Sequence, residues 1–151
     1  MIRLATATAT AAATLLLTAA PALAQSADDN KIVLTFETGA RTGMVMVALY
    51  DTARAFNGEG QNADANRAVA RTAISASGRV VATFDNLPAG DYAVKAFHDV
   101  NGDGEMNTNP FGMPTEPYAF SNNAVGNMGP ARWDRAHFAV SGETPQTISL
   151  R

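Results

Sequence analysis

Apolar residues recur at every second position along much of the chain, which is the period that β-strands produce. Ile32, Leu34 and Phe36 form the first series, and residues 44–50, which follow Gly43, are apolar at both parities. Because a strand that is apolar on both faces is usually covered on both sides, we expect 44–50 to be a central strand. Further strands are expected at 69–75, 80–84, 92–97, 136–140 and 146–150.

About seven short strands without a helical period favour an all-β fold, an antiparallel β-sandwich of immunoglobulin-like or prealbumin-like type. A small barrel would agree with the same strand count. Residues 51–67 have no clear period, so we interpret them as a long loop with room for one helical turn. Residues 85–90 form a tight corner before Tyr92 and Val94. This run resembles connections in many extracellular sandwiches, where such a tyrosine and valine point into the core.

The first 24 residues have the features of a secretory signal peptide. Arg3 precedes an apolar run, and Ala22-Leu23-Ala24 has the small-x-small pattern at which signal peptidase cleaves. The apolar run is well short of the roughly 20 residues that span a bilayer. We predict cleavage after Ala24, a single domain at residues 25–151, and a periplasmic or secreted protein without an integral membrane segment.

Composition narrows the classes of partner and chemistry. The chain has no cysteine, which excludes disulfides, thiolate metal sites and a cysteine nucleophile. A formal net charge of −3 without a cluster of basic residues argues against nucleic acid, which selects a basic face. We therefore expect the partner to be an envelope glycan or a protein. We also expect the protein to be a monomer.

The segment after the strand at 92–97 spaces its oxygen-bearing residues like a calcium loop. Counted from Asp99 as position 1, it places Asp or Asn at positions 3, 5 and 9, and glycine at position 6, where the chain must turn sharply. A backbone carbonyl would serve at position 7. Calcium takes six to eight oxygens, so the pattern predicts a calcium site in residues 99–107. Its predicted ligands are Asp99, Asn101, Asp103, Glu105 and Asn107.

The end of this loop departs from the calcium pattern. Position 12 is Pro110 instead of a bidentate glutamate, so the missing oxygens must come from elsewhere. Glu116 is the first candidate, followed by Asp134 or a backbone carbonyl. An ordinary turn is the alternative interpretation, because Asn and Asp readily hydrogen-bond their own backbone. A calcium site of this composition would have the modest affinity of extracellular modules, about 10⁻⁴ to 10⁻³ M.

Residues 99–135 separate two predicted strands, although structureless connections beyond about 12–15 residues are uncommon and often functional. Phe97 lies on the face opposite Tyr92, so we expect the long loop to fold back over it. Tyr118, Phe120 and Trp133 concentrate aromatic surface in this region. Two interpretations of these rings stay open: a small core within the loop, or a platform on which carbohydrate stacks.

Signs of catalysis are weak. An enzyme would have to centre on Glu116 or His98, in a pocket that reaches both. His98 ends its strand on the core face, where a histidine more often forms a structural hydrogen bond than ligates a metal. Ser121 has no evident base. For the polar run 121–123, a structural role and a ligand-binding role are equally open.

Many residues between Leu87 and Phe138 together match a known pattern. They are Leu87, Pro88, Gly90, Tyr92, Ala93, Val94, Phe97, His98, Asp99, Asn101, Gly104, Phe111, Gly112, Pro114, Glu116, Phe120, Ser121, Asn122, Gly129, Pro130, Ala136 and Phe138. With these residues the chain resembles a family of small exported bacterial proteins, domain of unknown function 2141, from about Ile32 to the C-terminus. The resemblance implies a signal peptide and a β-sandwich, but no activity, because none is assigned to the family. Asn107 stands where members usually carry aspartate, and Ala131 and Trp133 stand where proline and phenylalanine are more usual.

The sequence therefore predicts an exported, non-enzymatic β-sandwich. Its loop at 99–107 is predicted to bind calcium and so to order a surface for a ligand or a partner. The alternative is a carbohydrate-binding module that uses Tyr118, Phe120 and Trp133.

Overall fold

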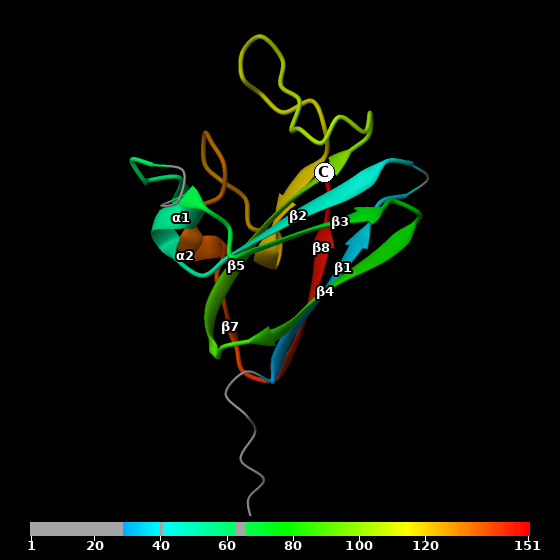
Figure 1. Cartoon of the computed structure of the whole chain (residues 1–151). Helices are drawn as coiled ribbons and strands as arrows, with labels where there is room; N and C mark the ends of the chain where they lie inside the picture. The colour runs from blue at the N-terminus through cyan, green and yellow to red at the C-terminus, as the bar shows by residue number, and fades with distance from the viewer. Residues whose placement is uncertain (1–28, 40, 63–65) are drawn as a thin grey trace, which may run out of the picture.

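The computed structural model describes residues 29–39, 41–62 and 66–151, which form eight strands, two short α-helices and a 3₁₀ turn (Figure 1). The strands are β1 (Asn30–Glu37), β2 (Met44–Tyr50), β3 (Ala70–Ser75), β4 (Arg79–Leu87), β5 (Gly90–Asp99), β6 (Tyr118–Phe120), β7 (Phe138–Val140) and β8 (Glu143–Ser149). The helices are α1 (Ala53–Asn57) and α2 (Trp133–Ala136), and the 3₁₀ turn is η2 (Ser121–Asn123). The predicted signal peptide, residues 1–24, lies outside the described residues. Within the described ranges, no helix is long and apolar enough to cross a bilayer.

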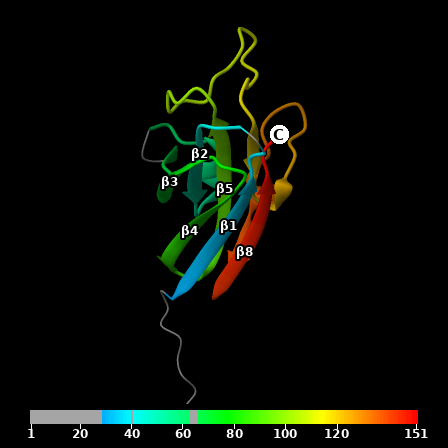
Figure 2. The same cartoon turned by 90° about the vertical axis from the view of Figure 1, so that its right-hand side faces the viewer.

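The strands form two open sheets, which confirms the predicted all-β sandwich in place of a barrel. One sheet has the order β4-β1-β8, seen as one layer in Figure 2, and the other has the order β3-β2-β5-β6 with β7 paired to β5. β2 lies between β3 and β5, so its prediction as a central strand is confirmed. The facing side chains of both sheets form one core. They include Ile32, Leu34, Phe36, Val45, Val47, Leu49, Val80, Phe84, Tyr92, Val94, Phe138 and Ile148.

The predicted corner at residues 85–90 is shorter than expected: β4 continues to Leu87, so the chain turns at Pro88 and Ala89 before β5 begins at Gly90. Tyr92 is buried, and its hydroxyl donates a hydrogen bond of 2.9 Å to the carbonyl of Pro88. The ring therefore packs in the core while its polar tip is satisfied at the rim.

One strand pair departs from the antiparallel arrangement that we predicted. β1 and β8 run parallel, with Ile32 opposite Thr144 and Phe36 opposite Ile148. The side chain of Asn30 fixes the end where both strands start, because it accepts the N–H of Gly142 and donates to the carbonyl of Leu87. Alternating hydrophobicity cannot reveal this direction, since side chains alternate in both kinds of pairing.

The long connection at 99–135 is less irregular than the sequence indicated. It contains β6, whose three residues are too few to show a period and which is defined by its pairing with β5. The strand expected to start at residue 136 begins instead at Phe138, because residues 133–136 form α2. In the loop at 51–67, the helical turn for which we allowed is α1, capped by Thr52.

A second, smaller core lies on the outer face of the five-stranded sheet, beneath α1 and α2. Its members are Tyr50, Ala55, Phe56, Ala68, Ala93, Phe120, Ala131 and Ala136. Phe56 of α1 meets the rings of Tyr50, Phe120 and Trp133 edge-on, at centroid distances of 5.6, 6.1 and 6.0 Å. This cluster covers one end of the outer face and leaves the rest for the groove described below.

The polar run at 121–123 has a structural role. The fully buried hydroxyl of Ser121 donates to the carbonyl of Ala136 at 2.6 Å and accepts the N–H of Val94 at 2.8 Å. The side chain of Asn122 donates to the carbonyl of His137, and that of Asn123 accepts the N–H of Ser149 in β8. These bonds tie β6 and its turn to α2, β5 and the opposite sheet.

Ser121→Ala is expected to lower the free energy of unfolding by about 1–3 kcal/mol, because the N–H of Val94 loses its buried acceptor and the carbonyl of Ala136 keeps only the 3.2 Å bond from Asn122. Urea denaturation followed by circular dichroism measures the change. Ser141→Ala, at an exposed serine, is the matched control and should stay within about 0.5 kcal/mol of the wild type. Equal stability of the two variants would contradict the structural role of Ser121.

Candidate functional site

The backbone at the start of the predicted calcium loop is hydrogen-bonded to the side chain of Asp99. Its carboxylate is only 1% exposed and accepts the N–H groups of Gly102 at 2.6 Å and Gly104 at 2.8 Å. Both glycines have φ near 80°, a conformation that glycine adopts without a steric penalty. The sharp turn expected at Gly104 is therefore present.

Asp103 lies at the centre of a polar network in the same loop. Its Oδ2 accepts the side-chain amides of Asn101 and Asn107, both at 2.8 Å, and its Oδ1 accepts the N–H of Glu105 at 2.9 Å. These bonds, foremost the one from Asn107, hold the pKa of Asp103 below its ordinary value, so the exposed carboxylate stays ionised at neutral pH. Two amide groups thus surround the anion in the structure.

Glu116, predicted as a further calcium ligand, closes the loop from the other side through backbone hydrogen bonds. It is buried; its Oε1 accepts the N–H of Val100 at 2.8 Å and its Oε2 accepts the N–H of Asn107 at 3.2 Å. An ionised carboxylate has about four acceptor positions, so the carboxylates of Asp99, Asp103 and Glu116 keep capacity beyond these amides.

The acidic side chains do not converge on one point in this conformation. Among the described residues, no group of three or more His, Cys, Asp or Glu side chains is close enough to hold a metal ion. Glu105 joins the network through its backbone N–H, and Asp134 lies in α2 beside the second core. A cation at residues 99–107 would therefore need the side-chain oxygens of Asn101 and Asn107, together with backbone carbonyls. In this structure the amide nitrogens of both asparagines face Asp103 instead.

The three aromatic residues predicted as a platform do not share one exposed face. Tyr118 is 38% exposed, whereas Phe120 is only 7% exposed and belongs to the second core. Trp133 packs against Phe56, and His137 stacks on its ring at a centroid distance of 5.6 Å and an interplanar angle of 6°. The loop-core interpretation therefore accounts for Phe120 and Trp133, and Tyr118 is the ring with an open surface.

His98 has the structural hydrogen bond that its position indicated. It is 1% exposed, and its Nε2 lies 2.9 Å from the carbonyl oxygen of Thr42. Neither His98 nor Glu116 is among the residues that line the groove on the outer face. The pocket that an enzyme centred on both residues would need is not formed by that groove.

A large groove lies on the outer face of the five-stranded sheet, with a volume of about 1150 Å³. Its floor is a grid that the strand register fixes. One row across β3, β2, β5 and β6 is Arg71, Ala48, Lys95 and Phe120, and the adjacent row is Ala73, Met46, Phe97 and Tyr118.

Two loops form the walls of this groove. One wall comes from Gly104, Met106 and residues 112–114 of the long connection, and the other comes from residues 128–130. The long connection extends past the end of the sheet (Figure 1) and does not fold back over Phe97 as we expected. Phe97 is half-buried and lies on the groove floor. Because Gly104 and Met106 lie within the predicted calcium loop, that loop and the groove share a wall.

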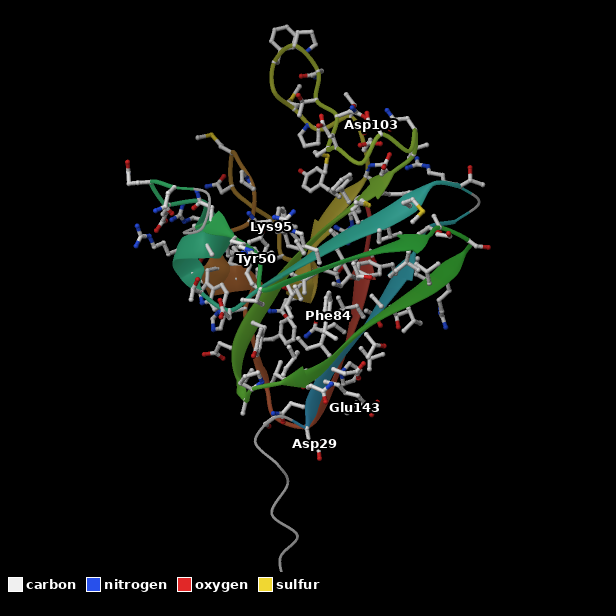
Figure 3. The ribbon with its side chains drawn as sticks, in the orientation of Figure 1. Asp29, Tyr50, Phe84, Lys95, Asp103 and Glu143 are labelled. Atoms are coloured by element: carbon white, nitrogen blue, oxygen red, sulfur yellow. The ribbon has the colours of Figure 1, made fainter. Side chains whose placement is uncertain are left out.

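Lys95 is the basic group at the inner end of the floor. Its Nζ lies 4.8 Å from the ring centroid of Phe56 and 5.1 Å from that of Tyr50. Figure 3 shows Lys95 next to Tyr50. Burial lowers the pKa of Lys95 from its ordinary value of 10.5. The same kind of burial raises the pKa of the Tyr50 hydroxyl. Lys95 is a site residue that the sequence did not predict. The signal for this face was that residues 44–50 are apolar at both parities and that Phe97 points outward.

Comparisons with known proteins identify a family and add no activity. No curated protein and no solved structure matches the chain. Residues 37–149 match a family described as "Uncharacterized protein conserved in bacteria (DUF2141)". The match covers β2 to β8, the loop at 99–107 and the groove, so this chain belongs to the DUF2141 family.

Proposed function

We propose that the protein is an exported, non-enzymatic binding domain whose loop at 99–107 takes up calcium and thereby orders one wall of a ligand-binding groove. The observation that carries the proposal is the shared wall: Gly104 and Met106 belong to the acidic loop and also line the groove. Export rests on the signal-like residues 1–24, and the periplasm or the exterior would supply the calcium.

The hydrogen bonds of the loop support calcium as its ligand. Asp103 is held ionised by two side-chain amides, and the buried carboxylates of Asp99 and Glu116 already lie against the loop backbone. A rotation of the Asn101 and Asn107 amides would turn oxygens in place of nitrogens towards the centre, and these oxygens would then join Asp99 and Asp103 as ligands. Calcium accepts such mixed carboxylate, amide and carbonyl sets with flexible geometry, whereas magnesium demands a near-ideal octahedron.

Calcium is expected to raise the melting temperature of the chain from Gln25 to Arg151, which retains every described residue. At 100 times the dissociation constant, a ligand that binds only the native state adds about 2.7 kcal/mol of stability. At this chain length that corresponds to several degrees. Thermal unfolding in EDTA, in magnesium and in rising calcium measures the effect. Asp103→Ala should abolish the calcium response but melt near the wild type in EDTA, because Asp103 is exposed and lies outside the strands.

Asp85→Ala is the matched control for this experiment, because Asp85 is exposed on β4 of the opposite sheet. It should keep the full calcium response. An Asp103→Ala protein that responds to calcium like the wild type would refute the assignment of the loop. A wild type that shows no shift at millimolar calcium would make residues 99–107 an ordinary turn.

The carbohydrate-binding alternative has less support, because Phe120 is buried and one face of Trp133 is covered by His137. Titration with oligosaccharides, followed by the fluorescence of Trp133, separates the two functions. Stacking of a sugar on the indole should quench or shift its emission. An unchanged spectrum at saturating sugar would exclude Trp133 from a carbohydrate site.

A further inference from the structure

The charged residues on the groove floor are all basic. Lys95 and Arg71 line the groove, and none of the described residues that line it is Asp or Glu. Acidic residues nevertheless outnumber basic ones in the chain, 14 to 11. The groove therefore presents positive charge on an otherwise mildly acidic protein, which favours an anionic ligand.

The sheet register places the two cationic residues on either side of a small one. Arg71, Ala48 and Lys95 lie in one row across β3, β2 and β5. Neighbouring strands are about 4.8 Å apart, so the backbones of Arg71 and Lys95 are about 10 Å apart with a single methyl group between them. This arrangement leaves room above Ala48 for one small anionic group.

Lys95 has no counter-ion among the described residues. The ion pairs of the described residues are Lys31–Glu143, Arg79–Glu37 and Arg132–Glu59, and none of them includes Lys95. Aromatic faces attract its ammonium, but they replace water less well than a carboxylate does. The amine is therefore poised for an anion that the described part of the chain does not itself supply.

The titration of Lys95 supports the same conclusion. Because burial lowers its pKa in the folded state, the unfolded chain holds more protons between that pKa and 10.5. The contribution of Lys95 to stability is therefore largest above pH 10.5 and falls as the pH drops towards its folded pKa. At neutral pH the unpaired ammonium destabilises the ligand-free fold.

The rest of the groove is apolar and adaptable. Met46, Phe97 and Tyr118 continue the floor next to Lys95, and Met106, Met113 and Met128 line the walls. Methionine side chains are flexible and polarizable, so they fit apolar groups of different shape. A volume of about 1150 Å³ accommodates a small molecule, and concave, mostly apolar sites with few polar groups are typical of such ligands.

We propose that the groove binds a small amphipathic carboxylate, with its apolar body on Met46, Phe97 and Tyr118 and its carboxylate paired with Nζ of Lys95. A neutral ligand would leave the ammonium unpaired, and a cationic ligand would be repelled by both basic residues. This carboxylate would be the ligand of the groove in the function proposed above. It depends on that function only because the loop at 99–107 forms one wall of the groove.

Octanoate, 1-octanol and octylammonium test the proposal, because they share one alkyl chain and differ in the charge of the head group. Each is titrated calorimetrically into the chain from Gln25 to Arg151 at millimolar calcium. Octanoate should bind at least about tenfold more tightly than 1-octanol, as expected for one hydrogen bond to a charged group. Octylammonium should bind no more tightly than 1-octanol.

Lys95→Met keeps an unbranched side chain and removes the charge. It should lower the affinity for octanoate to that for 1-octanol, and it should melt at or above the wild-type temperature without ligand, which shows that the variant folds. Lys31→Met is the matched control, because Lys31 and Lys95 are the only lysines of the chain and Lys31 pairs with Glu143 on β8. This control should keep the preference for octanoate.

Three results would overturn the proposal: equal affinity of the wild type for octanoate and 1-octanol, undiminished octanoate binding by Lys95→Met, or no binding of any probe. The calcium melting response of the same samples separates this proposal from the function on which it rests. A preference for octanoate without a calcium response supports the ligand class and refutes the calcium loop. A calcium response without that preference refutes the ligand class alone.

Discussion

Gly43→Ala is expected to destabilise the fold by about 2–5 kcal/mol, the sum of backbone strain and overpacking. Gly43 has a φ of 115°, which side chains with a Cβ rarely adopt. An added Cβ would also collide with the carbonyl oxygen of Asp99 and lie 3.0 Å from the Cα of Val100. Both neighbours are backbone atoms at the end of β5, so neither can move without disturbing the pairing of β2 with β5.

The same substitution should also weaken the calcium response, because the displaced backbone is that of Asp99, the first residue of the predicted loop. Chemical denaturation and calcium-dependent melting of one sample measure the two effects. Gly78→Ala is the control that has backbone strain without a collision, because Gly78 has a φ of 67° and nothing lies within 4 Å of an added Cβ. It should lose only about 1–2 kcal/mol, the usual penalty for a left-handed residue. The difference between the two variants therefore measures the collision at Gly43. Equal losses in both variants would show that the close approach of Gly43 to β5 is unimportant.

Phe56→Ala is expected to lower the free energy of unfolding by about 3–5 kcal/mol, the usual range for a buried phenylalanine. Phe56 is 1% exposed and joins Tyr50, Phe120 and Trp133 in the second core. Its ring also lies against the ammonium of Lys95. The substitution should therefore loosen α1, expose Trp133 and reduce octanoate affinity together.

Denaturation followed by the emission of Trp133 measures this effect, with a shift to longer wavelength as the indole meets water. Phe111→Ala is the matched control, because Phe111 is 88% exposed. Its stability should stay within about 0.5 kcal/mol of the wild type. A Phe56→Ala protein with wild-type stability and emission would mean that the second core does not hold the groove floor.

The sequence was sufficient for features that depend on neighbours along the chain. The alternation of Ile32, Leu34 and Phe36 identified β1, because a side chain on a strand meets the core at every second residue. The turn chemistry around Pro88 and Gly90 and the spacing from Asp99 to Asn107 likewise depend on local hydrogen bonds, which fold a short segment on itself. These bonds are present in the structure, whereas calcium itself stays a prediction.

The tertiary structure decided everything that depends on pairing between distant segments. The parallel direction of β1 and β8 leaves no trace in either strand's pattern, and β6 is a strand only because it pairs with β5. Phe120 and Trp133 are aromatic like the 38% exposed Tyr118, yet both pack against Phe56 of α1. Lys95 is one polar residue on an alternating strand. Its place beside Ala48 and Arg71 and over aromatic rings exists only because β2, β3 and β5 are in register. Local pattern determines which way a side chain points, and only the register determines what it meets there.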